Sequence, residues 1–214
     1  MSTVPGTIPK ARTSDTPVVA EIRHDEARIP GRNNGAGSVT EERVAYLEGL
    51  LRQARTAAAV FTQFTQDEVD RIVQPMVLAA QEQARYLARL AIGETRIGVL
   101  EDKYIKNMVA TEFVYNYVRD KRTVGVIREF PERGLAELAE PIGVIFSLLP
   151  ITNPTSTVLF KCIMAIKTRN AAIFSPHPNA SRCSSEAVRI NQSATQQLCL
   201  FLIADVRSEF GKLL

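Results

Sequence analysis

The spacing of apolar residues divides the chain into a helical first half and a second half that contains strands. Between residues 38 and 120, apolar side chains recur at intervals of three and four, which is typical of helices with one buried face. Two sequences with the spacing of a capping box, Ser38 to Glu41 and Thr65 to Glu68, predict helix starts. We therefore predict helices over residues 41–63, 66–80, 82–96 and 101–119.

The apolar stripes on these helices predict packing in a core. Pro75 should kink or split the second helix because proline lacks a backbone N–H donor. Gly98 is a natural end for the third helix. The stripe on the first helix consists of Val44, Leu47, Leu51, Ala54 and Ala58, and that on the fourth of Ile105, Met108, Val109, Phe113 and Tyr117.

Strand composition replaces the helical pattern over residues 122–140. Thr123 to Phe130 is followed by a turn at Pro131 to Gly134 and by a returning segment to Glu140. This pattern predicts a hairpin arm. Exposed hairpins need their edges covered, often by a second subunit, so we expect self-association through this arm.

A strand–helix–strand unit follows. Residues 142–149 form a nearly unbroken apolar run, which predicts a strand covered on both faces. Asn153 and Pro154 predict the start of a helix that runs to about Thr168, with Arg169-Asn170 as its stop. Its buried side is predicted to hold Val158, Phe160, Ile163, Met164 and Ile166, and a second strand is predicted over residues 171–174.

Such a unit is expected to be right-handed and to bind ligands beyond the carboxyl ends of its strands. Those ends lead into two loops, Pro150 to Thr155 and Ser175 to Pro178, which are the places to look for a site.

Composition adds little chemistry. The chain has 214 residues, a net charge of +3 and 23% charged residues, which is ordinary for a globular protein and gives no support for nucleic-acid binding. No apolar run is long enough to span a bilayer, and the first residues lack the pattern of a signal peptide. Its three cysteines, Cys162, Cys183 and Cys199, are an odd number in no metal-ligand spacing. We interpret the chain as cytoplasmic, with reduced thiols.

Several segments together resemble the acylating, coenzyme A-dependent aldehyde dehydrogenases, particularly the N-terminal half of the bifunctional aldehyde-alcohol dehydrogenases. The resemblance spans about residues 38 to 190. The segments that carry it are Glu140-Pro-Ile-Gly143, Pro150-Ile-Thr-Asn-Pro-Thr-Ser156, Lys167-Thr-Arg-Asn170, Phe174-Ser-Pro-His-Pro178, Phe64-Thr-Gln-Asp-Glu-Val-Asp70 and Glu101-Asp-Lys-Tyr-Ile-Lys-Asn107.

The resemblance implies an α/β fold with an N-terminal helical layer, a hairpin arm and an incomplete Rossmann-like parallel sheet. It also implies a reaction in which aldehyde, NAD and coenzyme A give acyl-coenzyme A and NADH through a cysteine thiolate. We expect five segments: a disordered extension over 1–37, a helical segment over 38–120, the hairpin arm over 121–141, a partial cofactor domain over 142–190 and a divergent tail over 191–214.

The resemblance assigns candidate site residues to the two loops. Asn153 matches the asparagine whose amide donates to the oxyanion formed on thiolate attack; the alternative is a helix cap before Pro154. Ser175 stands where ordinary aldehyde dehydrogenases carry a lysine that holds the cofactor's ribose. The remaining candidates for NAD contacts are Ile151 and Thr152, mainly through backbone, with Pro176 and His177.

No cysteine of the chain is expected to act as the nucleophile. Cys162 should be packed on the buried side of the crossover helix, Cys183 lies on a helix that leads away from the site, and Cys199 lies in the segment that matches nothing. The family's nucleophile comes later than this sequence extends. Two functions therefore stay open: a truncated aldehyde dehydrogenase that is inactive alone, and a non-catalytic module that binds full-length subunits.

Overall fold

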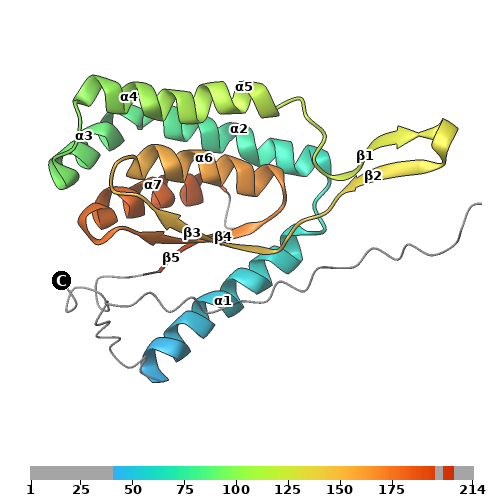
Figure 1. Cartoon of the computed structure of the whole chain (residues 1–214), viewed down its shortest axis with the longest axis horizontal. Coiled ribbons are helices and arrows are strands. Elements are labelled where there is room, and N and C mark those ends of the chain that lie inside the picture. Colours follow the sequence, from blue (N-terminus) through green and yellow to red (C-terminus); the bar gives the residue numbers. More distant parts are fainter. Residues whose placement is uncertain (1–40, 196–199, 205–214) are drawn as a thin grey trace, which may run out of the picture. The chain divides into compact units, whose positions relative to one another are not determined.

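The computed structural model describes residues 41–195 and 200–204 (Figure 1). The expected extension over 1–37, the start of the first capping box at Ser38, and Cys199 lie outside these residues. The helices are α1 (Glu41–Phe61), α2 (Gln66–Glu82), α3 (Ala84–Thr95), α4 (Leu100–Met108), the π-helical turn Val109–Phe113, α5 (Val114–Val118), α6 (Pro154–Lys167) and α7 (Ser181–Ala194). The strands are β1 (Gly125–Phe130), β2 (Leu135–Ala139), β3 (Val144–Leu149), β4 (Ala171–Pro176) and β5 (Phe201–Ile203).

The helical first half is confirmed, with small changes at the boundaries. The second capping box forms, because the Thr65 hydroxyl accepts from Glu68 N and the Glu68 carboxylate accepts from Thr65 N. Helix α2 continues through Pro75 without being split. Helix α3 ends earlier than predicted, with Arg96 rather than Gly98 as its left-handed cap.

The strand–helix–strand unit is confirmed as the centre of a parallel sheet of order β3-β4-β5. Helix α1 packs on one face of this sheet, and α6 and α7 pack on the other (Figure 1). The third strand was not predicted: β5 lies inside the expected divergent tail, and α7 continues past residue 190 to Ala194. Residues 191–194 therefore contribute a helix end to the fold, and residues 201–203 contribute a strand.

Strand β3 is covered on only one face along its second half, contrary to prediction. Ser147 and Leu149 face α6 and are buried. Phe146 and Leu148 point to the opposite face and are 56% and 71% exposed. The reason is that α1 covers Val144 at the start of the strand, and no described residue covers the positions beyond it. Ile142, predicted to start the strand, lies before it and is exposed.

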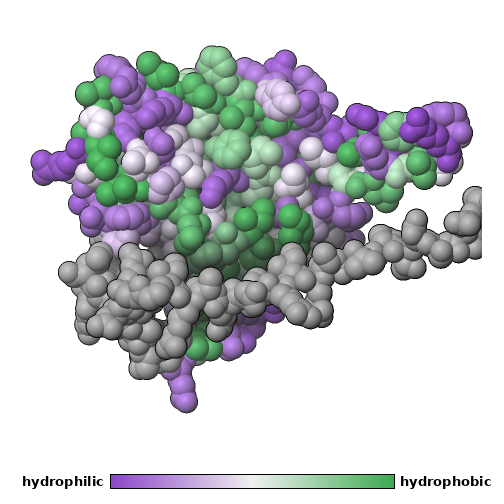
Figure 2. All heavy atoms as spheres, in the orientation of Figure 1, coloured by the Kyte–Doolittle hydropathy of each residue, from purple (hydrophilic) through white to green (hydrophobic). Residues whose placement is uncertain are grey.

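The apolar stripe on the fourth predicted helix does not pack in the core. Ile105, Val109, Phe113 and Tyr117 are all exposed, and Figure 2 shows hydrophobic residues at the surface where α4 and α5 lie. The face that turns inward is more polar and contains Lys103, Asn107, Ala110 and Thr111. The periodicity correctly grouped these apolar residues on one face of the helix, but the prediction that this face is buried was wrong. Val44 and Leu47 on α1 and Phe160 on α6 are likewise exposed rather than buried.

The end of α6 is held by two side chains whose roles differ from prediction. Arg169, not Asn170, takes the left-handed conformation, with φ of 55°. Its guanidinium donates to the carbonyls of Thr62 and Ala139, which stabilises this conformation. Asn170 Oδ1 instead accepts from Gly143 N at 2.7 Å and connects the loop before β4 to the start of β3.

The predicted hairpin arm is present. Strands β1 and β2 pair antiparallel, with Gly134 at φ of 63° closing the turn between them. None of the helices in the described ranges is long and apolar enough to cross a membrane.

Candidate functional site

The two loops singled out in the sequence meet at one edge of the sheet. In the parallel pairing of β3 and β4, Leu148 lies opposite Ser175 and Leu149 opposite Pro176. Both strands therefore end at the same level, and the turn before α6 lies beside the turn that begins at His177. Ser175 and Pro176 belong to β4 itself rather than to the turn after it, because β4 runs two residues further than predicted.

Asn153 precedes α6 but does not cap it with its side chain. Its backbone takes the first helical bond, since its carbonyl accepts from Thr157 N at 3.1 Å and from Thr157 Oγ1 at 2.6 Å. The Asn153 side chain makes no capping bond. Its Oδ1 instead accepts from Lys106 Nζ at 3.2 Å, and Nδ2 has no acceptor among the described residues. The carboxamide thus keeps a donor that faces no protein partner in this part of the chain.

Helix α4 supplies the contacts around this turn. Lys103 Nζ donates to the carbonyl of Thr152, and Lys106 Nζ donates to Asn153 Oδ1. Thr155 Oγ1 donates to Asn107 Oδ1 at 2.9 Å, and Asn107 Nδ2 donates to the carbonyl of Ala84 at 2.9 Å. This segment of α4 carries part of the resemblance, but its contacts with the turn were not predicted from the sequence. Their signal was the i, i+3, i+4 spacing of polar side chains on one helix face.

Lys103 is the unusual member of this group. Only 4% of its surface is exposed, and no carboxylate of the described residues pairs with it. Burial, which disfavours the charged form, lowers the pKa of the Lys103 ammonium, and the neighbouring Lys106 lowers it further.

Ile151 and Cys183 lie closer together than expected. Both belong to a small apolar cluster with Ala91 and Ala180, so the Ile151 side chain faces the protein interior. Cys183 thus lies beside the turn before α6, at the start of the helix that was expected to lead away from the site. Its thiol is nevertheless fully buried and donates to the carbonyl of Ala180 at 3.3 Å.

Neither described cysteine has the properties of a nucleophile. Burial raises the pKa of Cys183 to about 12, with a further contribution from the hydrogen bond and the charge of Glu94. Burial alone raises the pKa of Cys162 well above its usual range. A thiolate rather than a thiol attacks a carbonyl, so both side chains are inert at neutral pH.

We expect Cys162 and Cys183 to resist alkylation in the folded protein. At pH 8.5, where a free thiol is half ionised, a pKa of about 12 makes alkylation of Cys183 about a thousandfold slower. The measurement is peptide mapping after iodoacetamide treatment, with the same treatment in urea as the control. Labelling of Cys183 in the native protein at the rate of free cysteine would contradict this description.

Ser175 and His177 are the polar side chains at the end of β4. Ser175 is half-buried and points to the same face of the sheet as exposed Leu148, opposite which it pairs. His177 Nδ1 accepts from Asn179 N at 3.1 Å, which fixes the ring in the turn and leaves Nε2 without a partner among the described residues. A hydroxyl and an imidazole can each donate or accept a hydrogen bond from a ligand.

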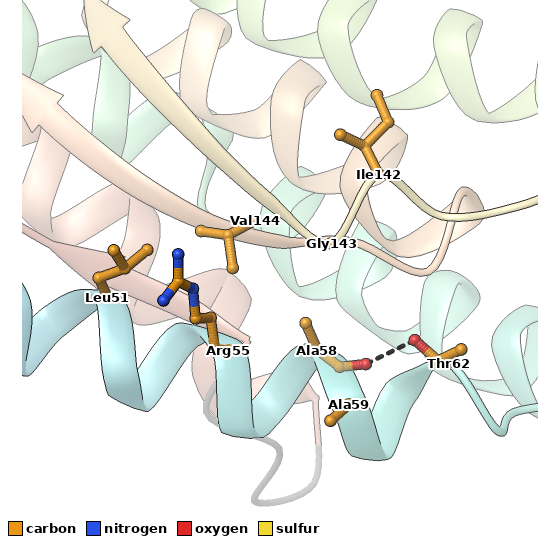
Figure 3. Close-up of a pocket in the computed structure, with 8 residues that line it drawn as sticks. All are labelled: Leu51, Arg55, Ala58, Ala59, Thr62, Ile142, Gly143 and Val144. Carbon is orange, nitrogen blue, oxygen red and sulfur yellow. Dashed lines mark hydrogen bonds between the residues drawn. The ribbon is translucent and has the colours of Figure 1, made fainter.

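A hollow of about 440 Å³ lies elsewhere, between α1 and the beginning of β3 (Figure 3). Arg55 and Val144 are among its lining residues. It sits at the amino end of the parallel strands, opposite the edge where such sheets bind ligands, so we do not assign the site to it. Residues 41–195 and 200–204 hold no group of three or more potential metal ligands.

Comparison with known proteins is consistent with this arrangement. A model of the aldehyde dehydrogenase family matches residues 22–212, a wider range than the motifs covered. The bifunctional aldehyde-alcohol dehydrogenase of Escherichia coli K12 is 44% identical over 147 residues, which is 69% of this chain and 16% of that protein. An acetylating aldehyde dehydrogenase from Geobacillus thermoglucosidasius is 43% identical, with a TM-score of 0.70 over 73% of this chain and 35% of that one.

A structure of propionaldehyde dehydrogenase from Rhodopseudomonas palustris with bound propionyl-CoA is also similar, at 27% identity and a TM-score of 0.60. The similarity covers 73% of this chain and 35% of that one. The chain thus spans about a third or less of the proteins that it matches. The family model covers most of the sequence, and one of the similar structures is that of an acetylating aldehyde dehydrogenase. The chain therefore belongs to the aldehyde dehydrogenase family.

Proposed function

We propose that this chain supplies the oxyanion donor and one wall of the cofactor crevice in the reaction of an aldehyde with NAD and coenzyme A to acyl-coenzyme A and NADH. The observation that carries the proposal is the state of the Asn153 carboxamide. Its oxygen is held by Lys106, its nitrogen has no acceptor within residues 41–195 and 200–204, and it lies at the carboxyl edge of the parallel sheet.

Asn153 has the chemistry that this reaction requires. When a thiolate forms a C–S bond to the aldehyde carbon, the carbonyl oxygen becomes negatively charged. An amide N–H that already points at that oxygen stabilises the charge without reorganising. A hydride then leaves the carbon, and the sulfur of coenzyme A displaces the enzyme's sulfur from the resulting thioester.

The thiolate for this reaction must come from outside the described residues of this chain. Cys162 and Cys183 are buried and protonated. Cys162 also lies further along the helix that starts after Asn153, at roughly 13 Å by the helical rise. A reacting sulfur must come within ~3.5 Å of the carbonyl carbon.

The cofactor contacts follow from the edge of the sheet. NAD, when bound, accepts the hydride. Ser175 and His177 would meet its hydroxyl groups, with Pro176 between them, and exposed Phe146 and Leu148 offer an apolar surface on the same side as Ser175. Ile151 would contribute backbone only, because its side chain packs inward. The Thr152 carbonyl is already bound by Lys103, so the backbone of Thr152 would contribute its N–H.

A chimera tests this proposal. Residues 41–195 replace the matching segment of the Escherichia coli bifunctional aldehyde-alcohol dehydrogenase, which supplies the remaining parts of the enzyme. We expect NADH formation from acetaldehyde that requires coenzyme A. A chimera that folds, as judged by thermal melting, yet forms no NADH would contradict the proposal.

Self-association through the hairpin is a second proposal. A non-catalytic module that binds full-length subunits could use the same hairpin. Leu135 and Leu138 are each 60% exposed on β2, and β1–β2 is a two-stranded sheet with open edges. Light scattering of the purified chain tests it. We expect a dimer or larger species, and we expect the double variant Leu135→Asp with Leu138→Asp to be a monomer. A monomeric wild type would contradict self-association through the hairpin.

We also propose that the chain lies in the cytoplasm, where its cysteines stay reduced.

A further inference from the structure

Three polar side chains on α4 hold the turn that carries Asn153. Lys103 donates to the carbonyl of Thr152, Lys106 donates to Asn153 Oδ1, and Asn107 accepts from Thr155 Oγ1. The three contacts reach Thr152, Asn153 and Thr155, all within four residues of the turn. We call Lys103, Lys106 and Asn107 the α4 clasp.

We propose that the α4 clasp is a positioning device that orients the Asn153 carboxamide with Nδ2 toward the reacting oxygen. The inference rests on the proposed function of Asn153, because orientation matters only if Nδ2 donates during the reaction.

The first argument is the direction of the Lys106 contact. The two ends of an asparagine carboxamide have similar size, and the side chain can turn over unless its hydrogen bonds distinguish oxygen from nitrogen. A lysine ammonium only donates, so its contact with Asn153 selects Oδ1. Nδ2 then points the other way. A positive charge at the oxygen also polarises the amide and strengthens its N–H donors.

The second argument is the burial of Lys103. Removing an ammonium from water is costly unless a carboxylate pairs with it, and Lys103 has only a neutral carbonyl partner among the described residues. Gly98 leaves room for it: a Cβ at Gly98 would come within 3.2 Å of Lys103 Cε. An apolar side chain of similar shape would be at least as stable in this position. A role in fixing the turn explains why a lysine is present.

The third argument is the anchoring of Asn107. Its amide donates to the carbonyl of Ala84 at the start of α3, while its oxygen accepts from Thr155 in the first turn of α6. Both Asn107 and Thr155 are buried. The clasp is therefore fixed to the α3–α4 pair and does not move independently of it.

Nuclear magnetic resonance of the full 214-residue chain tests the clasp directly. The side-chain amide signals of Asn153 are assigned by their absence in Asn153→Ala. We expect Lys106→Met to move these signals and Lys106→Arg, which keeps a donor, to leave them near their wild-type positions. Lys121→Met is the matched control, because this lysine contacts Tyr117 and not the turn. Asn153 signals that do not respond to Lys106→Met, or that respond equally to Lys121→Met, would overturn the proposal.

Lys103→Met distinguishes positioning from a structural role. We expect the midpoint of urea unfolding to stay the same or rise, while the Asn153 signals shift or broaden. A lower midpoint with unchanged Asn153 signals would show that Lys103 is a structural residue only, and would overturn its part in the clasp.

Kinetics of the chimera separate this proposal from the proposed function. Lys106→Met should lower kcat about tenfold to a hundredfold with KM for the aldehyde unchanged, because misplacing a catalytic group by ~1 Å can cost about a hundredfold. Should Asn153→Ala leave kcat unchanged, the proposed function fails, whatever the clasp does. Should Asn153→Ala lower kcat while Lys106→Met does not, the clasp fails and the proposed function stands.

Discussion

Replacing Asn153 by alanine in the chimera is expected to lower kcat by about 10²–10³, the usual effect of removing one oxyanion donor. The loss arises because Nδ2 has no other partner among the described residues and is free to donate to the developing charge. KM should change little, since this contact strengthens only when the oxygen becomes negative. The measurement is steady-state NADH formation with saturating NAD and coenzyme A.

Asn116→Ala is the control for this experiment. Asn116 is an exposed asparagine on α5, away from the turn, and its replacement should leave kcat unchanged. A kcat for Asn153→Ala within about twofold of the parent chimera would show that another group stabilises the oxyanion. The helix start would then be the only role left for Asn153.

Replacing Phe201 by alanine is expected to lower the free energy of unfolding by about 3 kcal/mol, at the lower end for a buried phenylalanine. Phe201 lies in β5, is 4% exposed and packs edge-on against Phe174, with ring centroids 6.0 Å apart. Strand β5 is short and lies at the edge of the described sheet, which favours the lower value. Urea unfolding followed by circular dichroism measures the change.

Two variants sharpen this result. Phe113→Ala removes an exposed phenylalanine and should change stability by less than about 0.5 kcal/mol. Phe201→Leu keeps most of the volume and should cost less than about 1.5 kcal/mol, so it stays folded if the alanine variant does not. Equal stability of Phe201→Ala and wild type would show that residues 200–204 do not belong to the core.

The central unit was predictable because its signals are local. Apolar runs broken by Pro150, Asn153 and Pro154 define a strand, a turn and a helix start within a few residues. The capping box at Thr65 and the hairpin turn at Gly134 are equally local. In each case the residues that determine the element also form it.

Features that depend on distant residues were missed. The stripe from Ile105 to Tyr117 has the period of a buried face, but the side that turns inward depends on what α2, α3 and α6 offer for packing. Lys167 was quoted only as part of the resemblance, and its burial and its contact with Asp70 of α2 at 2.7 Å were not predicted. Strand β5 contains three residues and forms because β4 is beside it.

The position of the candidate site stays a prediction from the sequence and the resemblance, and the contacts that support the Asn153 turn were not predicted. The carboxyl edge and Asn153 followed from the sequence and the resemblance, whereas the contacts from Lys103, Lys106 and Asn107 cross about 48 residues of chain. No local sequence pattern predicts which backbone carbonyl a lysine side chain will contact. Cys183 shows the same limit, since its proximity to Ile151 depends on how α7 returns past α3.

NADH formation by the isolated 214-residue chain tests the central claim most directly. We propose an oxyanion donor on this chain, find no reactive thiolate among its described residues and expect none at Cys199. We therefore expect acetaldehyde, NAD and coenzyme A to give no NADH above the protein-free rate, while the chimera is active under the same conditions. A clear rate in the isolated chain that disappears on Cys183→Ser would contradict the account, because it would identify a nucleophile in a thiol described here as buried and protonated.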